Sequence, residues 1–220
     1  MFSIAVSILA LPNLTDPVLL SSPLWAYTES SLSLVCIASG YFLYDTVTCM
    51  VWHDIYSFEF LAHGAISFQI FFWGTRPFLN YYASIFLLFE VSTIFLNLNW
   101  FLDKAKMTMS PIGIVNGLIL LFTFGGVRVV FGLYQSYHFW VTMLSNTDTV
   151  HVYFIIYYLV SNLILCSLNI FWYSKMIQMV IAKVTEPKKN SASPSVDASS
   201  SPTSKKAANG KSTNGAVHRH

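Results

Sequence analysis

The 220-residue chain is 55% hydrophobic and only 10% charged, with a formal net charge of +2. Because soluble domains carry roughly a quarter charged residues, this composition excludes an ordinary water-soluble domain and gives no sign of nucleic-acid binding. The mean hydropathy of +0.56 predicts an all-α, polytopic bundle of membrane-spanning helices. Cys36, Cys49 and Cys166 all lie within apolar stretches, where cysteine acts as a small hydrophobic residue. We therefore expect no disulfide framework, no metal and no cofactor.

Residues 1–30 form an N-terminal apolar segment followed by a loop. The stretch from Met1 to Leu11 is apolar but too short to cross a bilayer. It also lacks the basic start of a secretory signal. We interpret it either as an interfacial segment or as the remnant of a further helix. Pro17 and Pro23 then interrupt a connection that is rich in turn-forming residues.

A transmembrane domain is predicted over residues 31–183. A span requires about 20 predominantly apolar residues, and turn or charged residues separate the apolar stretches here. The chain therefore predicts about five spans, and six if the N-terminal segment completes another. The five stretches cover residues 31–52, 56–73, 77–102, 111–134 and 150–173.

Residues 184–220 are predicted to form a disordered polar tail, because they contain too few large apolar side chains to offset the entropy lost on ordering. The basic residues indicate the orientation, since short cytosolic loops carry the Lys and Arg excess. Lys104 and Lys106 follow the third span and Lys175 follows the fifth, whereas residues 135–149 contain no Lys or Arg. Arg76 is the one basic residue on the opposite side. The C-terminus is therefore expected to be cytosolic.

Five ionisable residues lie within the predicted spans, namely Asp45, Glu59, His63, Glu90 and Arg128. A charge at the bilayer centre costs at least about 2.5 kcal/mol, so such side chains face the bundle interior and have partners. We expect Arg128 to pair with Glu90 or Asp45, because an unpaired buried guanidinium is much costlier than an ion pair. The pair fits two interpretations: a polar pocket for a lipid headgroup or acyl carbonyl, or a packing contact between helices.

His63 and Glu59 are four residues apart and share one face of a helix. A histidine oriented by an acid can act as a general base or a nucleophile, and Glu59 or Asp45 would supply that acid. The alternative is a neutral histidine that forms a hydrogen bond to a neighbouring helix.

Three parts of the sequence resemble the TLC-domain family, which includes the ceramide synthases and the translocating-chain-associating membrane protein. Residues 40–45 read Gly-Tyr-Phe-Leu-Tyr-Asp, His63 follows eighteen residues later, and residues 90–101 read Glu-x-Ser-Thr-x-Phe-Leu-Asn-x-x-Trp-Phe. Arg128 also stands where the small, non-ceramide-synthase branch carries an arginine. The resemblance implies a protein of the endoplasmic reticulum membrane. Because the family usually has at least one more helix ahead of residue 40, this chain is expected to be short at its N-terminus.

The sequence also departs from the ceramide synthases. They carry a pair of histidines where this chain has His63 and Gly64, and their later series of acids is reduced here to Glu90, with Thr93 and Asn97 at the other positions. The resemblance therefore implies lipid homeostasis, while the missing residues argue against ordinary ceramide synthesis.

Two functions remain open at this point, and membrane lipids are the expected partners in both. The first is binding or sensing of a lipid in a polar pocket formed by Asp45, His63, Glu90, Arg128 and Asn97. The second is acyl transfer by His63, oriented by Glu59 or Glu90, with acyl-CoA as a substrate. A transporter or channel is disfavoured, because the sequence has no internal repeat and no matching pair of broken helices. The oligomeric state and the identity of the lipid are left open.

Overall fold

Every regular element in the described part of the chain is helical, which confirms the predicted all-α fold. The computed structural model describes residues 2–185, apart from the side chains of residues 183 and 184, so most of the predicted tail lies outside it. The helices are α1 (Phe2–Ala10), η1 (Pro12–Leu14), α2 (Pro17–Ser21), α3 (Glu29–Val51), α4 (Phe58–Gly74), α5 (Asn80–Leu87), α6 (Glu90–Lys104), α7 (Pro111–Thr123), η2 (Phe124–Phe131), α8 (Gly132–Leu144) and α9 (Val152–Thr185).

Four helical segments among residues 2–185 are long and apolar enough to cross a membrane. These are α3, the joined helix α5–α6 of 25 residues, the joined helix α7–η2–α8 of 34 residues, and α9. They correspond to four of the five predicted spans. The remaining one, α4, has 17 residues and is about 25 Å long, slightly less than the roughly 30 Å of a hydrocarbon core.

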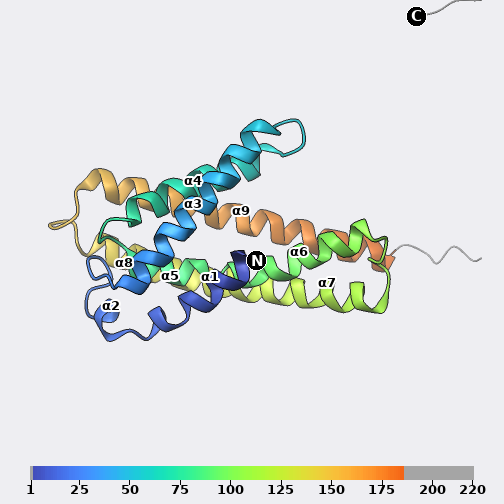
Figure 1. Ribbon diagram of the computed structural model, residues 1–220, viewed down its shortest axis with the longest axis horizontal. Coiled ribbons are helices and arrows are strands. Elements are labelled where there is room, and N and C mark those ends of the chain that lie inside the picture. The colour runs from blue at the N-terminus through green and yellow to red at the C-terminus, as the bar shows by residue number, and fades with distance from the viewer. Residues whose placement is uncertain (1, 186–220) are drawn as a thin grey trace, which may run out of the picture. The chain divides into compact units, whose positions relative to one another are not determined.

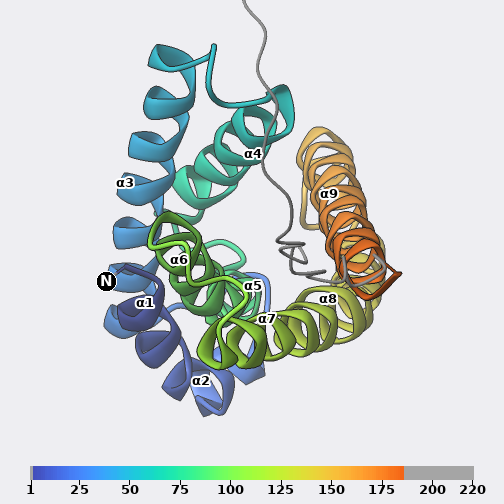
Figure 2. The same cartoon turned by 90° about the vertical axis from the view of Figure 1, so that its right-hand side faces the viewer.

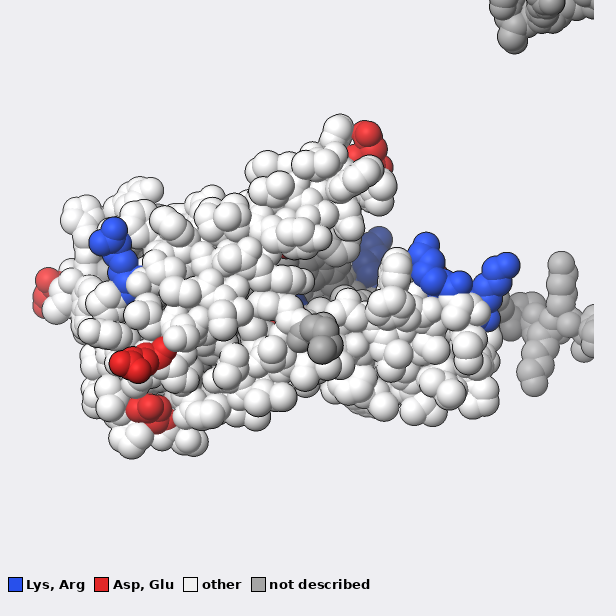
Figure 3. Space-filling model, in the orientation of Figure 1, with Lys and Arg blue, Asp and Glu red and all other residues white. Residues whose placement is uncertain are grey.

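Each of the long segments α3, α4, α5–α6, α7–η2–α8 and α9 runs antiparallel to the one before it, and together they surround a common centre when viewed end-on (Figures 1 and 2). α3 and α4 form one side of the bundle, α9 another, and α7, η2 and α8 a third, with α5 and α6 between them. The connections α3–α4 and α6–α7 share one end of the bundle with the C-terminal end of α9. Lys and Arg side chains gather near this end, whereas the other end shows mostly acidic groups (Figure 3).

α1 packs one face against the bundle, while Ile4, Ile8 and Leu9 on its other face are exposed. Val6 and Ala10 are fully buried in a cluster with apolar residues of α3, α4 and α5. The segment that follows α1 is also attached to the bundle, because the Asn13 amide donates to the Ser84 hydroxyl at 3.1 Å. Residues 2–14 therefore contribute to the same core as α3 and α5.

The connection between α4 and α5 is a tight turn held by one side chain. The buried Asn80 amide nitrogen donates to the carbonyls of Gly74, Arg76 and Phe78 at 3.0 to 3.3 Å. Leu79 has a φ of 60°, in the left-handed region that a leucine rarely adopts. Its amide donates to the carbonyl of Leu24 at 2.7 Å. This turn fixes the position of the first residues of α5.

Candidate functional site: a cavity with one polar end

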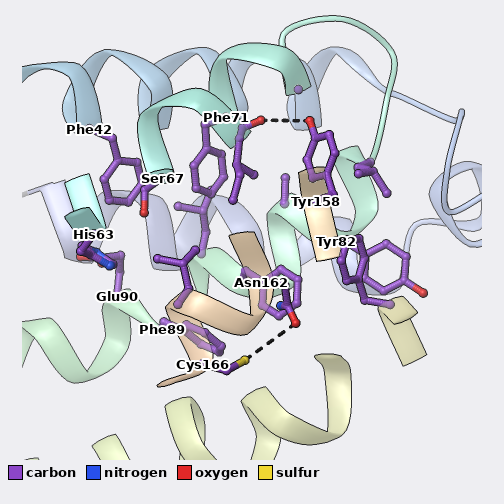
Figure 4. Close-up of a pocket in the computed structure, with 18 of the residues that line it drawn as sticks. Phe42, His63, Ser67, Phe71, Tyr82, Phe89, Glu90, Tyr158, Asn162 and Cys166 are labelled. Carbon is purple, nitrogen blue, oxygen red and sulfur yellow. Dashed lines mark hydrogen bonds between the residues drawn. The ribbon is translucent and has the colours of Figure 1, made fainter. Parts of the chain in front are cut away.

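A cavity lies within the bundle and is lined by residues of α4, α5, α6, η2, α8 and α9, with Phe42 contributed by α3. It leaves about 90 Å³ of space for the centre of a water-sized sphere. Most of its lining is aromatic or aliphatic. The polar exceptions gather mainly at the level of Glu90 and His63, which Figure 4 shows near Phe42 and Ser67.

Arg128 is the centre of this polar end and is only 7% exposed. Its Nη2 lies 3.5 Å from the Glu90 carboxylate, so the expected ion pair forms with Glu90. The guanidinium also donates to the side chains of Ser92 at 2.9 Å, Thr93 at 2.8 Å and Asn169 at 3.4 Å. The hydrogen bonds to Ser92, Thr93 and Asn169 use three of the five guanidinium hydrogens. Within residues 2–185, one hydrogen on Nη1 is left without a partner beside the cavity.

Glu90 is held from two sides and is only 6% exposed. Besides Arg128, its carboxylate accepts a hydrogen bond from the Ser3 hydroxyl of α1 at 2.8 Å. The charges of Glu90 and Arg128 therefore balance each other inside the bundle.

Both helices that carry this ion pair have irregular backbones at that level. The joined helix α5–α6 tightens just before Glu90, where the amides of Leu88 and Phe89 bond to carbonyls only three residues back. Arg128 lies in η2, an eight-residue π-helix within the joined helix α7–η2–α8. Irregular backbone at membrane depth is tolerated where it lines a cavity, and π-helical turns are frequent at functional sites.

Glycine explains how η2 approaches α9. A Cβ atom built at Gly125 would lie 2.6 Å from the Tyr173 hydroxyl oxygen, so any larger residue would displace the Tyr173 ring or the α9 backbone that carries it. Gly126, in contrast, has nothing within 4 Å of the same position. Gly125 thus permits the close contact that places Asn169 of α9 beside Arg128.

His63 lines the cavity from α4. Its ring packs edge-on against Phe42, with centroids 6.0 Å apart, and against Trp172 at 5.4 Å. Within the described residues, neither ring nitrogen makes a hydrogen bond or an ion pair. Glu59, one turn earlier on α4, is therefore not a partner of the imidazole. The buried Ser67 hydroxyl lies one turn further along α4 and also lines the cavity.

A second polar cluster connects α8 to α9 along the cavity wall. Trp140 donates from its indole nitrogen to the side-chain oxygen of Asn162 at 2.9 Å, and the side-chain nitrogen of Asn162 donates to the Ser136 hydroxyl at 3.0 Å. The Ser136 hydroxyl also lies 3.2 Å from the Cys166 sulfur. Asn162 and Cys166 line the cavity (Figure 4). The bonds of Asn162 and Cys166 to Trp140 and Ser136 fix the relative position of α8 and α9.

Three predicted site residues lie outside the cavity. Asp45 is partly buried on α3, and its Oδ2 lies 3.0 Å from where a Cβ of Gly64 would stand. Glu59 is also partly buried but does not line the cavity, and Asn97 is exposed on α6. Asn97 lies two turns beyond Glu90 on α6, past the level of this cavity. Of the predicted set, the structure brings together His63, Glu90 and Arg128.

Sequence reasoning missed the residues that satisfy these charges. Ser92 and Thr93 belong to the same motif as Glu90, and Asn162 and Asn169 are spaced seven residues apart on one face of α9. That spacing of polar residues within an apolar helix was a usable signal. Ser3 carried no such signal, because it is a small residue in a segment that was not expected to reach the bundle interior.

No three His, Cys, Asp or Glu side chains in the described part of the chain come together as a metal site would require. The fold and the cavity instead define a helical membrane protein with a polar centre inside an apolar bundle. The chain belongs to the TLC-domain family, whose model matches residues 1–178.

Curated relatives of this family are found in fungi and in human. An uncharacterized TLC domain-containing protein of Schizosaccharomyces pombe is 31% identical over 76% of this chain and 58% of its own length. Topoisomerase I damage affected protein 4 of Saccharomyces cerevisiae is 31% identical over 80% of this chain and 64% of its own. Human TLC domain-containing protein 4 is 23% identical over 81% and 70%, respectively. The chain thus spans about three fifths of the length of the two fungal relatives. No solved structure gave a significant match.

Proposed function

We propose that the protein binds a lipid inside the bundle, with an uncharged oxygen of the lipid at the Arg128 end of the cavity. The observation that carries the proposal is that the charged residues of the cavity lie at one end, whereas the remainder is mostly aromatic and aliphatic and the Asn162 and Cys166 side chains within it already bond to Ser136. A lipid is divided in the same way. Ligand sites are typically apolar clefts with a few convergent polar groups.

The hydrogen-bonding groups at the polar end favour an acceptor. Arg128 has an unused hydrogen among the described contacts, and the Asn169 amide nitrogen has no partner there either. Glu90 already balances the charge of Arg128, so a phosphate or carboxylate would bring an unbalanced charge into the membrane interior. An ester, amide or hydroxyl oxygen would satisfy the donors without adding charge.

The test is to purify the full chain in mild detergent and identify the lipids that remain bound by mass spectrometry. We expect a lipid to be retained by the wild type and lost from Asn169→Leu, which removes a donor at the polar end. Asn97→Leu is the matched control, because Asn97 is exposed and does not line the cavity. Equal retention by both variants, or no retained lipid in the wild type, would contradict the proposal.

A second function, acyl transfer by His63, is favoured by one observation. The His63 ring lies at the cavity wall near the polar end, and its nitrogens have no hydrogen-bond partner among residues 2–185. Incubation with acyl-CoA and a panel of amine and lysolipid acceptors tests it, with His63→Ala alongside. Product that disappears in a well-folded His63→Ala protein would establish acyl transfer, and no product in the wild type would exclude it for that panel.

The proposal includes the location and the orientation of the bundle. We place the protein in the endoplasmic reticulum membrane, in keeping with lipid homeostasis, and the end of α9 on the cytosolic side. The basic side chains at that end, including Lys104, Lys106 and Lys175, support the orientation, since cytosolic loops carry the Lys and Arg excess. Protease protection of tags placed after residue 185 and within residues 145–151 in sealed microsomes tests it. Cleavage only at the first tag is expected, and the reverse pattern would refute it.

A further inference from the structure

Four chain segments bring residues to the polar end of the cavity, and the same four bring residues to its other end. They are α4, the joined helix α5–α6 with the residue that precedes it, the joined helix η2–α8, and α9. The two sets are separated by 11 residues on every one of these segments. The pairs are His63 and Gly74, Glu90 and Leu79, Arg128 and Phe139, and Asn169 and Tyr158, and all eight residues line the cavity. At 1.5 Å per residue the two ends are about 16 Å apart.

The far end of the cavity is formed by buried, mostly aromatic residues. Leu79, Tyr82, Phe139 and Tyr158 are each no more than 5% exposed and belong to one apolar cluster. Tyr82 packs edge-on against Phe139 with ring centroids 5.2 Å apart, and its hydroxyl lies 2.7 Å from that of Thr142. The backbone hydrogen bonds of the α4–α5 turn fix Leu79. Both tyrosine hydroxyls at this end already have partners, since Tyr82 bonds to Thr142 and Tyr158 donates to the Ile70 carbonyl at 3.4 Å.

The width of the cavity suits one chain. A space of about 90 Å³ for the centre of a water-sized sphere, taken as a uniform tube over about 16 Å and widened by the radius of a water molecule on each side, gives a channel about 5 Å across. That is the width of a single hydrocarbon chain. A depth of about 16 Å accommodates about 12 to 14 carbons, given carbon–carbon bonds of about 1.5 Å in a zigzag.

We propose that the cavity takes one unbranched hydrocarbon chain of about 12 to 14 carbons beyond the polar group of its ligand, and that Leu79, Phe139 and Tyr158 set this length limit. The inference rests on the proposed function and specifies its ligand. The ligand is an uncharged lipid whose ester, amide or hydroxyl group lies at Arg128 and whose chain points toward the α4–α5 turn. Any second chain of the ligand stays outside the channel.

Two substitutions are expected to change the length limit in opposite directions. Ala83 is 8% exposed and lines the cavity seven residues from Glu90, or about 10 Å along the helix. Ala83→Leu blocks the channel there and shortens the preferred chain to about 8 carbons. Phe139→Ala opens the wall and lengthens it by about two to four carbons. Phe139→Leu, a smaller change in volume, gives a smaller shift and is the variant of choice if Phe139→Ala does not fold.

Met143 provides the matched control. It is fully buried in the same cluster as Phe139 but does not line the cavity. Met143→Ala therefore loosens the same core without changing the channel, and we expect it to leave the preferred chain length unchanged.

The experiment is native mass spectrometry of the full chain with saturated monoacylglycerols of 8 to 18 carbons, together with the chain lengths of lipids that co-purify. We expect the strongest binding at about 12 to 14 carbons and the two opposite shifts, each at least fivefold in relative occupancy. Binding that is independent of chain length, or a preference that no cavity variant changes, would overturn the length limit while leaving lipid binding intact. Absence of any bound lipid in the wild type would instead contradict the proposed function.

Discussion

The buried ion pair between Glu90 and Arg128 allows a sharp test of how the bundle is held together. Glu90→Leu removes the carboxylate that lies 3.5 Å from the guanidinium and leaves the Arg128 charge unbalanced inside the bundle. Arg128→Met makes the opposite change. The double variant places two apolar side chains of similar length where the pair stood.

The expected magnitudes follow from the cost of an unpaired buried charge. Breaking a buried pair by removing one partner costs about 3 to 5 kcal/mol, whereas replacing both partners by apolar residues is often neutral. For a chain of this size 1 kcal/mol corresponds to roughly 2 to 4 °C in Tm. Glu90→Leu should therefore lower Tm by roughly 6 to 20 °C, and the double variant should recover most of that loss.

The assay is the Tm of the purified chain in detergent, followed by size-exclusion chromatography after heating. Recovery will not be complete, because Ser92, Thr93 and Asn169 lose the hydrogen bonds they make to Arg128. If Glu90→Leu alone leaves Tm unchanged, or if the double variant is no more stable than either single one, the reasoning about this pair is refuted.

Two pairs of glycine substitutions test the close helix contacts. Gly125→Ala should lower Tm markedly, since its Cβ would lie 2.6 Å from the Tyr173 hydroxyl. Gly126→Ala, whose Cβ would have nothing within 4 Å, should leave Tm unchanged or raise it. Equal effects of the two substitutions would contradict the contact with α9. Gly64→His, which recreates the histidine pair of the ceramide synthases, should abolish the monodisperse protein, because even a Cβ there lies 3.0 Å from Asp45 and 3.1 Å from the Thr46 hydroxyl. Gly64→Ala should be tolerated with a small loss of Tm. Normal expression and Tm of Gly64→His would show that α3 and α4 are not packed as described.

The ion pair was predictable from the sequence because the energetics allow few solutions. Arg128 lies deep in an apolar stretch, and only Glu90 and Asp45 offered it a carboxylate at comparable depth. Sequence alone did not decide between them. The choice of Glu90 depends on the packing of α6 against η2, which brings Ser92 and Thr93 to the same guanidinium.

Asn97 shows why the helix face of a residue does not by itself predict whether the residue belongs to a site. It lies seven residues after Glu90, so it projects from nearly the same face of α6. Those two turns carry it about 10 Å along the helix, past the cavity and into an exposed position. Helical periodicity gives a direction around the axis, whereas membership of a site also depends on which helices are adjacent at that depth.

The irregular backbone could not be predicted from local propensity. The pair Gly125 and Gly126 indicates a weak point in the helix, but the π-helix also depends on the contact of Gly125 with Tyr173 of α9, which is distant in sequence. The 17-residue length of α4 likewise follows from the turn that Asn80 holds, and not from the apolar pattern of residues 56–73.

The central claim is that a lipid chain occupies the cavity between the polar end and the wall at Phe139. Photocrosslinking tests it most directly, with a monoacylglycerol whose 12-carbon chain carries a diazirine at its end, followed by peptide mapping with and without excess unlabelled lipid. The account predicts competable labelling at Tyr82, Phe139 or Tyr158, the buried residues of the wall. Labelling confined to lipid-facing residues such as Val130 and Leu133, which are exposed on the bundle surface, would contradict it.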